Sequence, residues 1–364
     1  MTTPAIVKLR KELRFNSPVF RHALRSAFAV TLAIAASHIL NLHHGIWLPI
    51  SVLVIMRPSL GGTLRIGWNR LLGTVIGASI GIGMLLSLGE HHGILIPLIL
   101  AALFLTLFLK VYNYTAYITA LTTMVVLALG LIMPMGWKLG MVRILDTFLG
   151  VGIGVGCAFL LWPTRARKSI RRETKKTLCA LEKHFSLLAD HYLSGQTGND
   201  SVIPSRIKVN EQLAECRESF REAAAEPGLS SAQRQELSRL LRTFSRIADL
   251  LSALYTVITR AKGKPLPEIK KYTATLLKET RELFSWMVSY AGSPETCGDK
   301  PDHRSAIHRF LIMGSRLRSI GTFDKVPLQR RNNISALVWN IRTIGAELDL
   351  AHERITALRK GRKN

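Results

Sequence analysis

Apolar residues and charges occupy different parts of this chain, and that separation limits what it can fold into. Residues 23–162 hold only seven Lys or Arg and two acids, Glu90 and Asp146. Residues 163–364 hold 37 of the 49 bases and 21 of the 24 acids. A net charge of +25 on a chain that is 48% hydrophobic, arranged in this way, excludes a single soluble globule and an intrinsically disordered protein. The pattern predicts a membrane domain followed by a polar domain.

Six apolar segments in the first half are candidate transmembrane helices. A helix needs ~20 residues to cross ~30 Å of hydrocarbon. Five of the segments approach or reach that length, whereas the second is short and contains Pro49, which predicts a tilted or broken helix. The segments run over about 23–42, 45–56, 71–89, 93–109, 115–134 and 141–162.

The basic residues give an expected orientation. Connections on the side of the N-terminus carry 17 Lys or Arg, whereas the opposite side carries only Lys138. The positive-inside rule then places both termini in the cytoplasm, with Trp47 as an interfacial anchor near the outer boundary. The chain is therefore expected to be a multi-pass protein of the inner (plasma) membrane. We divide it into an amphipathic N-terminal segment (1–22), a transmembrane domain (23–163) and a cytoplasmic α-helical domain (164–364).

One stretch of the membrane domain occurs twice. Residues 70–83 align without gaps on residues 143–156, and seven of the 14 positions are identical. The offset of 73 residues corresponds to about three spans, so the two copies are expected to cross the membrane in opposite directions. This is the 3+3 inverted repeat of secondary transporters. Chance alignment of Gly- and Ile-rich segments is the alternative, but the matched Arg and Thr positions favour a true repeat.

Charged residues at membrane depth are the first candidates for function. Arg143 and Asp146 lie three residues apart at the start of the sixth segment, and such groups point to a functional site. A local ion pair that only neutralises both charges is the alternative. The connection 57–74 adds three arginines that are predicted to form a cationic vestibule for organic anions. A positive loop that only fixes topology is the alternative there. The residues assigned to the substrate path are Arg57, Arg65, Asn69, Arg70, Thr74, Arg143, Asp146 and Thr147.

Other chemistry has little support in the sequence. The doublets His43-His44 and His91-His92, beside Glu90, suggest a metal site or a pH sensor, but solvated interfacial histidines are the commoner explanation. The chain contains no catalytic triad pattern, P-loop, Rossmann fingerprint or H-E-x-x-H motif. We therefore expect no enzyme, no cofactor and no bound metal. Active transport would have to use a gradient.

The polar half reads as a helical bundle. Helix patterns are separated by Gly and Pro clusters, and Ser230 and Asp302 are expected helix caps. The predicted helices run over 165–194, 205–225, 230–261, 267–291, 303–321 and 328–360. A basic run follows the last span directly, and we expect it to contact anionic lipid headgroups. Nucleic-acid binding is the rival reading, disfavoured because an acidic membrane surface already lies beside the bundle. The lipid-binding run comprises Arg165, Arg167, Lys168, Arg171 and Arg172.

Several motifs of the membrane half resemble a known family. The stretches 20–25, 44–74, 143–154 and 160–163 resemble the fusaric acid resistance (FUSC) family, which includes aromatic acid exporters and YccS-like inner membrane proteins. The resemblance covers about residues 17–163. The plant aluminium-activated malate transporters, which are dimeric organic-anion channels, are more distantly similar. The residues that carry the resemblance are Trp47, Pro58, Gly61 or Gly62, Thr63, Arg70, Gly73, Thr74, Arg143, Asp146, Thr147 and Gly150.

The resemblance implies a transporter that exports organic anions such as aromatic carboxylates. Arg70 and Arg143 would attract the carboxylate, Thr74 and Thr147 would donate hydrogen bonds, and Asp146 would tune Arg143 or take a proton. A dimeric organic-anion channel and a non-transporting membrane anchor with a partner-binding bundle are the alternatives. Larger family members carry two modules of each kind, so a homodimer is implied here. The lipid bilayer is a further partner, and a periplasmic adaptor protein is a candidate one.

Overall fold

The computed structural model describes residues 17–42, 45–88, 92–132, 136–162, 167–195, 201–260, 267–319 and 326–360. Within these ranges the chain forms helices and turns and no strand, which confirms the predicted all-α class. The chain divides into two compact units, residues 1–166 and 167–364. Each unit is described separately below.

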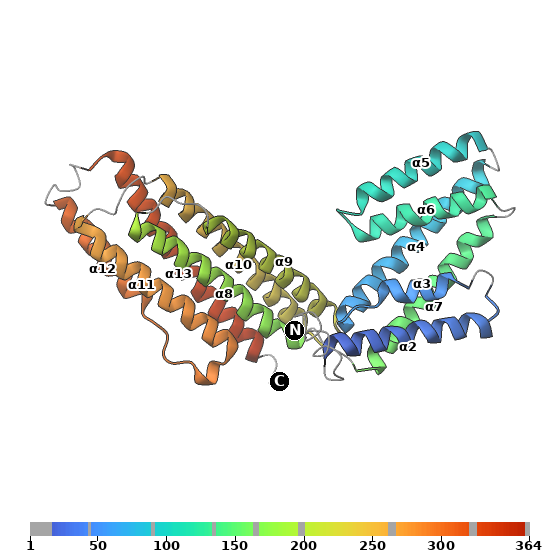
Figure 1. The fold of residues 1–364 in the computed structure, drawn as a ribbon, viewed down its shortest axis with the longest axis horizontal. Coiled ribbons are helices and arrows are strands. Elements are labelled where there is room, and N and C mark those ends of the chain that lie inside the picture. The colour runs from blue at the N-terminus through green and yellow to red at the C-terminus, as the bar shows by residue number, and fades with distance from the viewer. Residues whose placement is uncertain are drawn as a thin grey trace, which may run out of the picture. The chain divides into compact units, whose positions relative to one another are not determined.

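The described residues of the first unit form six helices, one at each predicted apolar segment (Figure 1). They are α2 (Pro18–Ile39), α3 (Trp47–Ile55), α4 (Leu60–Leu88), α5 (His92–Leu109), α6 (Tyr114–Ile132) and α7 (Gly136–Leu160). Helix α2 begins where the sequence indicated, because the Ser17 side chain accepts a hydrogen bond from the Val19 N–H at 3.2 Å and Pro18 occupies the first turn.

Four of these helices are long and apolar enough to cross a membrane: Val19–Ile39, Leu60–Leu88, Tyr114–Ile132 and Gly140–Leu160. The apolar part of α5, Gly93–Leu109, is shorter. Helix α3 has nine residues, which rise about 13 Å, less than half of the ~30 Å hydrocarbon thickness. The second apolar segment is therefore a half-length helix, in line with the broken helix expected there.

The expectation of a long connection over 57–74 is wrong. Helix α4 begins at Leu60, so only the residues from Met56 to Ser59 lie between α3 and α4. The Ser59 hydroxyl accepts a hydrogen bond from the Gly62 N–H at 3.0 Å and caps the helix. Gly61 and Gly62, which suggested a turn, occupy the buried first helical turn instead.

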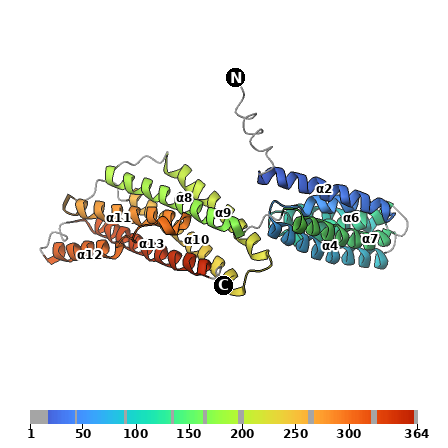
Figure 2. The ribbon, with the colours of Figure 1, turned by 90° about the horizontal axis from the view of Figure 1, so that it is seen from below.

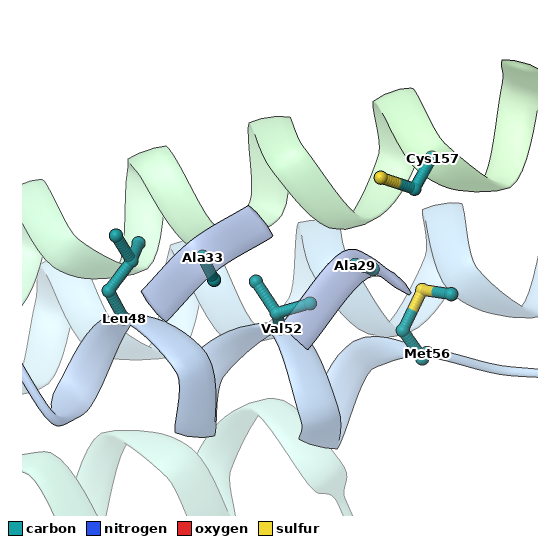
Figure 3. Close-up of a cluster of buried hydrophobic side chains, with 6 residues drawn as sticks. All are labelled: Ala29, Ala33, Leu48, Val52, Met56 and Cys157. Carbon is teal, nitrogen blue, oxygen red and sulfur yellow. The ribbon is translucent and has the colours of Figure 1, made fainter. Parts of the chain in front are cut away.

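Two groups of three helices make up the first unit. Helices α2, α3 and α7 pack against one another, and α4 and α5 both pack against α6. Figure 3 shows the core of the first group, where small residues of α2 face larger side chains of α3 beside α7. This cluster consists of Ala29, Ala33, Leu48, Val52, Met56 and Cys157. The two groups meet mainly where α4 packs against α7.

The second unit is a bundle of long amphipathic helices that run side by side (Figure 1, Figure 2). Its helices are α8 (Arg167–Ser194), α9 (Val202–Ala225), α10 (Ser231–Arg260), α11 (Pro267–Gly292), η1 (Pro294–Thr296), α12 (His303–Ser319) and α13 (Leu328–Lys360). These bounds agree closely with the prediction. Both predicted caps are confirmed: Ser230 and Gln233 exchange two hydrogen bonds of 3.1 Å, and Asp302 accepts from the Ser305 N–H at 3.3 Å.

Candidate functional site

The candidate site of the first unit centres on a buried cation, Arg143. This arginine lies on α7 with only 8% of its surface exposed. Its guanidinium carbon lies 3.9 Å from the ring centroid of Trp47, the first residue of α3. An indole face attracts a guanidinium electrostatically and also shields it from water. Trp47 is therefore part of the Arg143 site rather than an interfacial anchor alone.

Two further charged groups act on Arg143. Asp146, one turn along α7, attracts the guanidinium, and Arg70 of α4 repels it. Arg70 and Arg143 are the two arginines that open the repeated stretch, 73 residues apart in the sequence. The Nε–H groups of both arginines are buried and donate to no hydrogen-bond acceptor within the ranges that the structure describes. The fold thus brings together Trp47, Arg70, Arg143 and Asp146, and the last of these is only 1% exposed.

The two threonines predicted for this site are buried as well. Thr74 lies on α4, one turn after Arg70, and Thr147 lies on α7 beside Asp146. The remaining predicted residues do not gather around Arg143 in the same way. Arg57 is exposed between α3 and α4, whereas Arg65 and Asn69 are half-buried on α4. The predicted cationic vestibule is therefore not a loop: two of its three arginines lie on one helix.

Arg25 has a role that the sequence analysis missed. It lies within α2, is 2% exposed, and its Nη2 donates to the carbonyl oxygens of Arg57 at 2.6 Å and Pro58 at 3.1 Å. These carbonyls belong to the short break between α3 and α4, where no helix supplies partners for them. Thr63 supports the same break, because its hydroxyl accepts from the Arg57 N–H at 3.0 Å. Arg25 therefore fixes the point at which α3 ends and α4 begins.

Glycines set the spacing between helices of the first unit. A Cβ added to Gly73 of α4 would lie 2.8 Å from the Thr115 carbonyl oxygen of α6, and one added to Gly77 would overlap the Thr119 carbonyl oxygen. The Thr123 hydroxyl also donates to the Gly77 carbonyl oxygen at 2.9 Å. Backbones this close are typical of small-residue contacts in membrane helices.

The second copy of the repeat makes the equivalent contact elsewhere. A Cβ added to Gly150 of α7 would lie 2.7 Å from Ser51 Cβ of α3 and 3.3 Å from the Leu48 carbonyl oxygen. Gly73 and Gly77 of α4 thus pack on α6, and Gly150 and Gly154 of α7 pack on α3. Helices α4 and α7 themselves run in opposite directions, because Gly67 faces Val151 and Gly140 faces Ile82.

Some predicted residues fall outside the part of the chain that is described. These are His43, His44, Glu90 and His91, together with Arg165 of the lipid-binding run. Arg167 and Lys168 belong to the first turn of α8, and Arg171 and Arg172 are exposed on it. Among the described residues, no group of three or more His, Cys, Asp or Glu is placed to hold a metal ion.

Two buried histidines stand out in the second unit. His184 of α8 is almost fully buried, and its Nδ1 lies 3.2 Å from the Ser205 hydroxyl of α9. Burial, together with a smaller effect of the Arg206 charge, lowers the pKa of His184 to about 4. His303 of α12 is hydrogen-bonded to the Thr280 hydroxyl at 2.9 Å, and burial lowers its pKa also. Both rings are neutral at pH 7, so they serve the packing of the bundle.

Comparison with known proteins points to one family. Residues 32–157, which include Trp47, Arg70, Arg143 and Asp146, match the model of fusaric acid resistance protein-like proteins. The chain is 23% identical over 248 residues to the inner membrane protein YccS of Escherichia coli, covering 68% of this chain and 34% of that protein.

Two further relatives have similar sequence identity to this chain. The uncharacterised protein YhfK of Escherichia coli is 25% identical over 267 residues, which cover 73% of this chain and 37% of that protein. The uncharacterised protein ORF2 of Neisseria gonorrhoeae is 26% identical over 225 residues, which cover 60% of this chain and 52% of that protein. This chain thus spans about a third to a half of the length of these relatives. It is a membrane protein whose first unit is similar, over residues 32–157, to fusaric acid resistance protein-like proteins.

Proposed function

We propose that this protein is an inner-membrane transporter that exports organic anions, such as aromatic carboxylates, at the expense of a gradient. The observation that carries the proposal is the burial of Arg143 among apolar helices, stacked on Trp47 and within electrostatic reach of Arg70. Burying a cation in a membrane costs free energy, so a cation that is kept there points to a function. The match of residues 32–157 to the fusaric acid resistance protein-like model supports a transport-related role.

The geometry around Arg143 suits a carboxylate ligand. Trp47 covers one face of the guanidinium, which leaves the N–H groups at its edge to donate hydrogen bonds. A guanidinium edge matches a carboxylate with two parallel hydrogen bonds. Arg70 would add a second positive charge, and Thr74 and Thr147 would add hydroxyl donors. Asp146 would balance Arg143 when the site is empty, or accept a proton during the cycle.

We further propose that the membrane unit is a 3+3 inverted repeat, with α2–α4 as the first repeat and α5–α7 as the second. The third helix of each repeat, α4 or α7, lies in one group with the first two helices of the other repeat. The first group pairs α2 and α3 with α7, and the second pairs α5 and α6 with α4. Each group therefore joins two helices of one repeat to the third helix of the other. The antiparallel course of α4 and α7, and the matching glycine contacts, support this arrangement. Sites of such transporters lie between the two halves, near the midplane.

The remaining elements of the proposal concern assembly and orientation. Both termini would be cytoplasmic, and so would the bundle of the second unit. The basic start of α8, including the exposed Arg171 and Arg172, would contact anionic headgroups. A homodimer is expected by analogy with longer relatives, of which this chain covers about a third to a half. A periplasmic adaptor is a further candidate partner.

Efflux from proteoliposomes tests the proposal. Vesicles that contain the full chain are loaded with radiolabelled 4-hydroxybenzoate, and its release is followed with and without a proton gradient. Wild type should show saturable, gradient-dependent release. Arg143→Ala should reduce the initial rate about tenfold or more, because it removes charge-assisted hydrogen bonds worth ~1.5–3 kcal/mol. Arg143→Lys should remain impaired, since an ammonium lacks the planar fork.

The control is Lys110→Ala, which removes an exposed cation from the turn between α5 and α6. Its release rate should equal that of wild type. Release that follows the membrane potential without saturation would support an anion channel instead of a carrier. No release from well-folded wild-type protein, over a panel of aromatic and aliphatic carboxylates, would refute transport and leave the membrane-anchor reading.

A further inference from the structure

One surface of the second unit is both strongly basic and apolar. From His303 to Ala346 the chain has seven Arg and one Lys against a single acid, Asp324. Four large apolar side chains in this stretch are exposed, among them Ile312 at 53% and Trp339 at 60%. The α12–α13 surface, as we name it, comprises Leu311, Ile312, Leu328 and Trp339 with Arg304, Arg309, Arg316 and Arg342. Arg304 pairs with Asp349 and Arg309 pairs with Glu279, so Arg316 and Arg342 are the cations proposed to meet a ligand.

These residues lie on two neighbouring helices, which touch where the start of α12 meets the middle of α13. The His303 ring of α12 lies against Gly345 of α13, and Arg304 donates to Asp349 at 3.4 Å. Only eight residues separate the end of α12 at Ser319 from Leu328, a connection of at most ~30 Å. Both helices must therefore extend from the shared contact toward the same end of the bundle, so their exposed apolar residues lie at that end.

The α12–α13 surface lies at the end of the bundle where α8 finishes. Thr280 of α11, which holds His303, is followed by Arg281, and this arginine pairs with Asp190 near the end of α8 at 2.6 Å. Helix α8 has 28 residues, so its basic start lies about 40 Å away along the bundle. The surface is thus separate from the basic run that follows the last span.

The charge of the surface decides which occupant fits it. A second copy of the chain, docked by the same face, would set arginine against arginine, which is unfavourable. Anionic phospholipid matches it better, because guanidinium groups bind phosphate while Trp, Leu and Ile enter the headgroup boundary. The first unit is a membrane unit on the same chain, so the bundle is tethered to a bilayer. We propose that the α12–α13 surface binds anionic phospholipid.

Photo-crosslinking tests this contact in the full chain. Ile312→benzoylphenylalanine places the probe on the surface, and Ile207→benzoylphenylalanine is the matched control because Ile207 of α9 is 52% exposed. Each variant is reconstituted in vesicles of phosphatidylcholine alone or mixed with phosphatidylglycerol. Phospholipid adducts should form at position 312, about fivefold more with phosphatidylglycerol than without it. Adding Arg316→Gln and Arg342→Gln should remove that increase.

Other outcomes overturn the proposal. Equal adduct yields in both vesicle types would show that anionic lipid is not the ligand. Equal yields at positions 207 and 312 would show that the contact does not belong to the α12–α13 surface. A crosslinked dimer in place of the lipid adduct would assign the surface to a second copy. Thermal melting of each variant confirms that it is folded, and the readout is independent of transport.

Discussion

Replacing Arg25 by Met should loosen the break between α3 and α4. Methionine is unbranched and similar in length, so it fills the same space without the guanidinium. The substitution removes the two hydrogen bonds to the carbonyl oxygens of Arg57 and Pro58. Because these carbonyls lie in an exposed turn, water can replace part of what is lost. The substitution also removes the cost of burying a charge.

The magnitude follows from these opposing terms. Two hydrogen bonds from a charged donor contribute ~1.5–3 kcal/mol each to stability. Part of this loss is offset, because methionine carries no charge that must be buried and because water can hydrogen-bond to the freed carbonyls. We expect a net loss of about 3 kcal/mol in the free energy of unfolding. For a unit of this size that corresponds to a fall of roughly 6–12 °C in Tm. Arg25→Lys should recover part of the loss, since an ammonium can reach one carbonyl at a time.

Thermal unfolding of the purified full chain in detergent measures the effect. The control is Arg21→Met, one turn earlier on α2, where the side chain is half-buried and not fully enclosed. A Tm shift of Arg25→Met no larger than that of Arg21→Met would refute the reasoning. The hydrogen bonds at the break would then contribute nothing beyond what water supplies.

Three other substitutions follow from the geometry. Gly77→Ala should destabilise by about 1–3 kcal/mol, because its Cβ would overlap the Thr119 carbonyl oxygen, whereas Gly83→Ala, which faces open space, should leave the Tm unchanged or raise it. Trp47→Leu should slow hydroxybenzoate release about fivefold, since it removes a cation–π contact worth ~1 kcal/mol. Denaturant titrations of wild type should show stability falling as pH drops from 6.5 toward 4, because the unfolded His184 takes up a proton that the folded state excludes. His184→Gln should lessen that fall by roughly 3 kcal/mol, and identical pH profiles would contradict the assignment.

Local patterns in the sequence predicted the helices well. Ser230 and Asp302 cap helices as expected, and Ser17 caps α2 in the same way, because a cap depends on residues only two or three positions away. The amphipathic face of α10 is buried as its spacing predicted, with Leu240, Phe244 and Ile247 fully enclosed. The expected loop over 57–74 failed because Gly61 and Gly62 signal a turn only when nothing holds them in a helix, and Ser59 does so here.

Contacts between distant helices were beyond sequence reasoning. The motifs marked Trp47 and Arg143 separately, but their 3.9 Å contact depends on how α3 packs against α7. Arg25 gave one usable signal, a cation inside an apolar segment with no acid on its own helix. Its partners are backbone carbonyls, which carry no side-chain signature, so the sequence could not identify them.

The packing of the two helix groups predicts which interface moves during transport. Within the second group, Gly77 approaches the α6 backbone and accepts a hydrogen bond from Thr123, so α4 and α6 should move together. Between the groups, Gly140 of α7 faces side-chain atoms of Ile82 of α4 and Val126 of α6 and no backbone atom among its nearest neighbours, so this contact can slide. Arg70 and Arg143 lie on these two helices, so sliding would change the distance between the two arginines and with it the affinity for an anion.

Paired cysteines test this directly. A short thiol crosslinker between Ile82→Cys and Gly140→Cys should abolish hydroxybenzoate release, because it joins the two groups, and cleavage of the link should restore it. Leu85→Cys with Gly130→Cys is the matched control, since Gly130 of α6 likewise faces the side-chain end of an α4 residue but within one group. Crosslinking that control pair should leave release unchanged. Full release with the Ile82–Gly140 pair crosslinked would contradict sliding at α4–α7 and would require the movement to lie elsewhere in the unit.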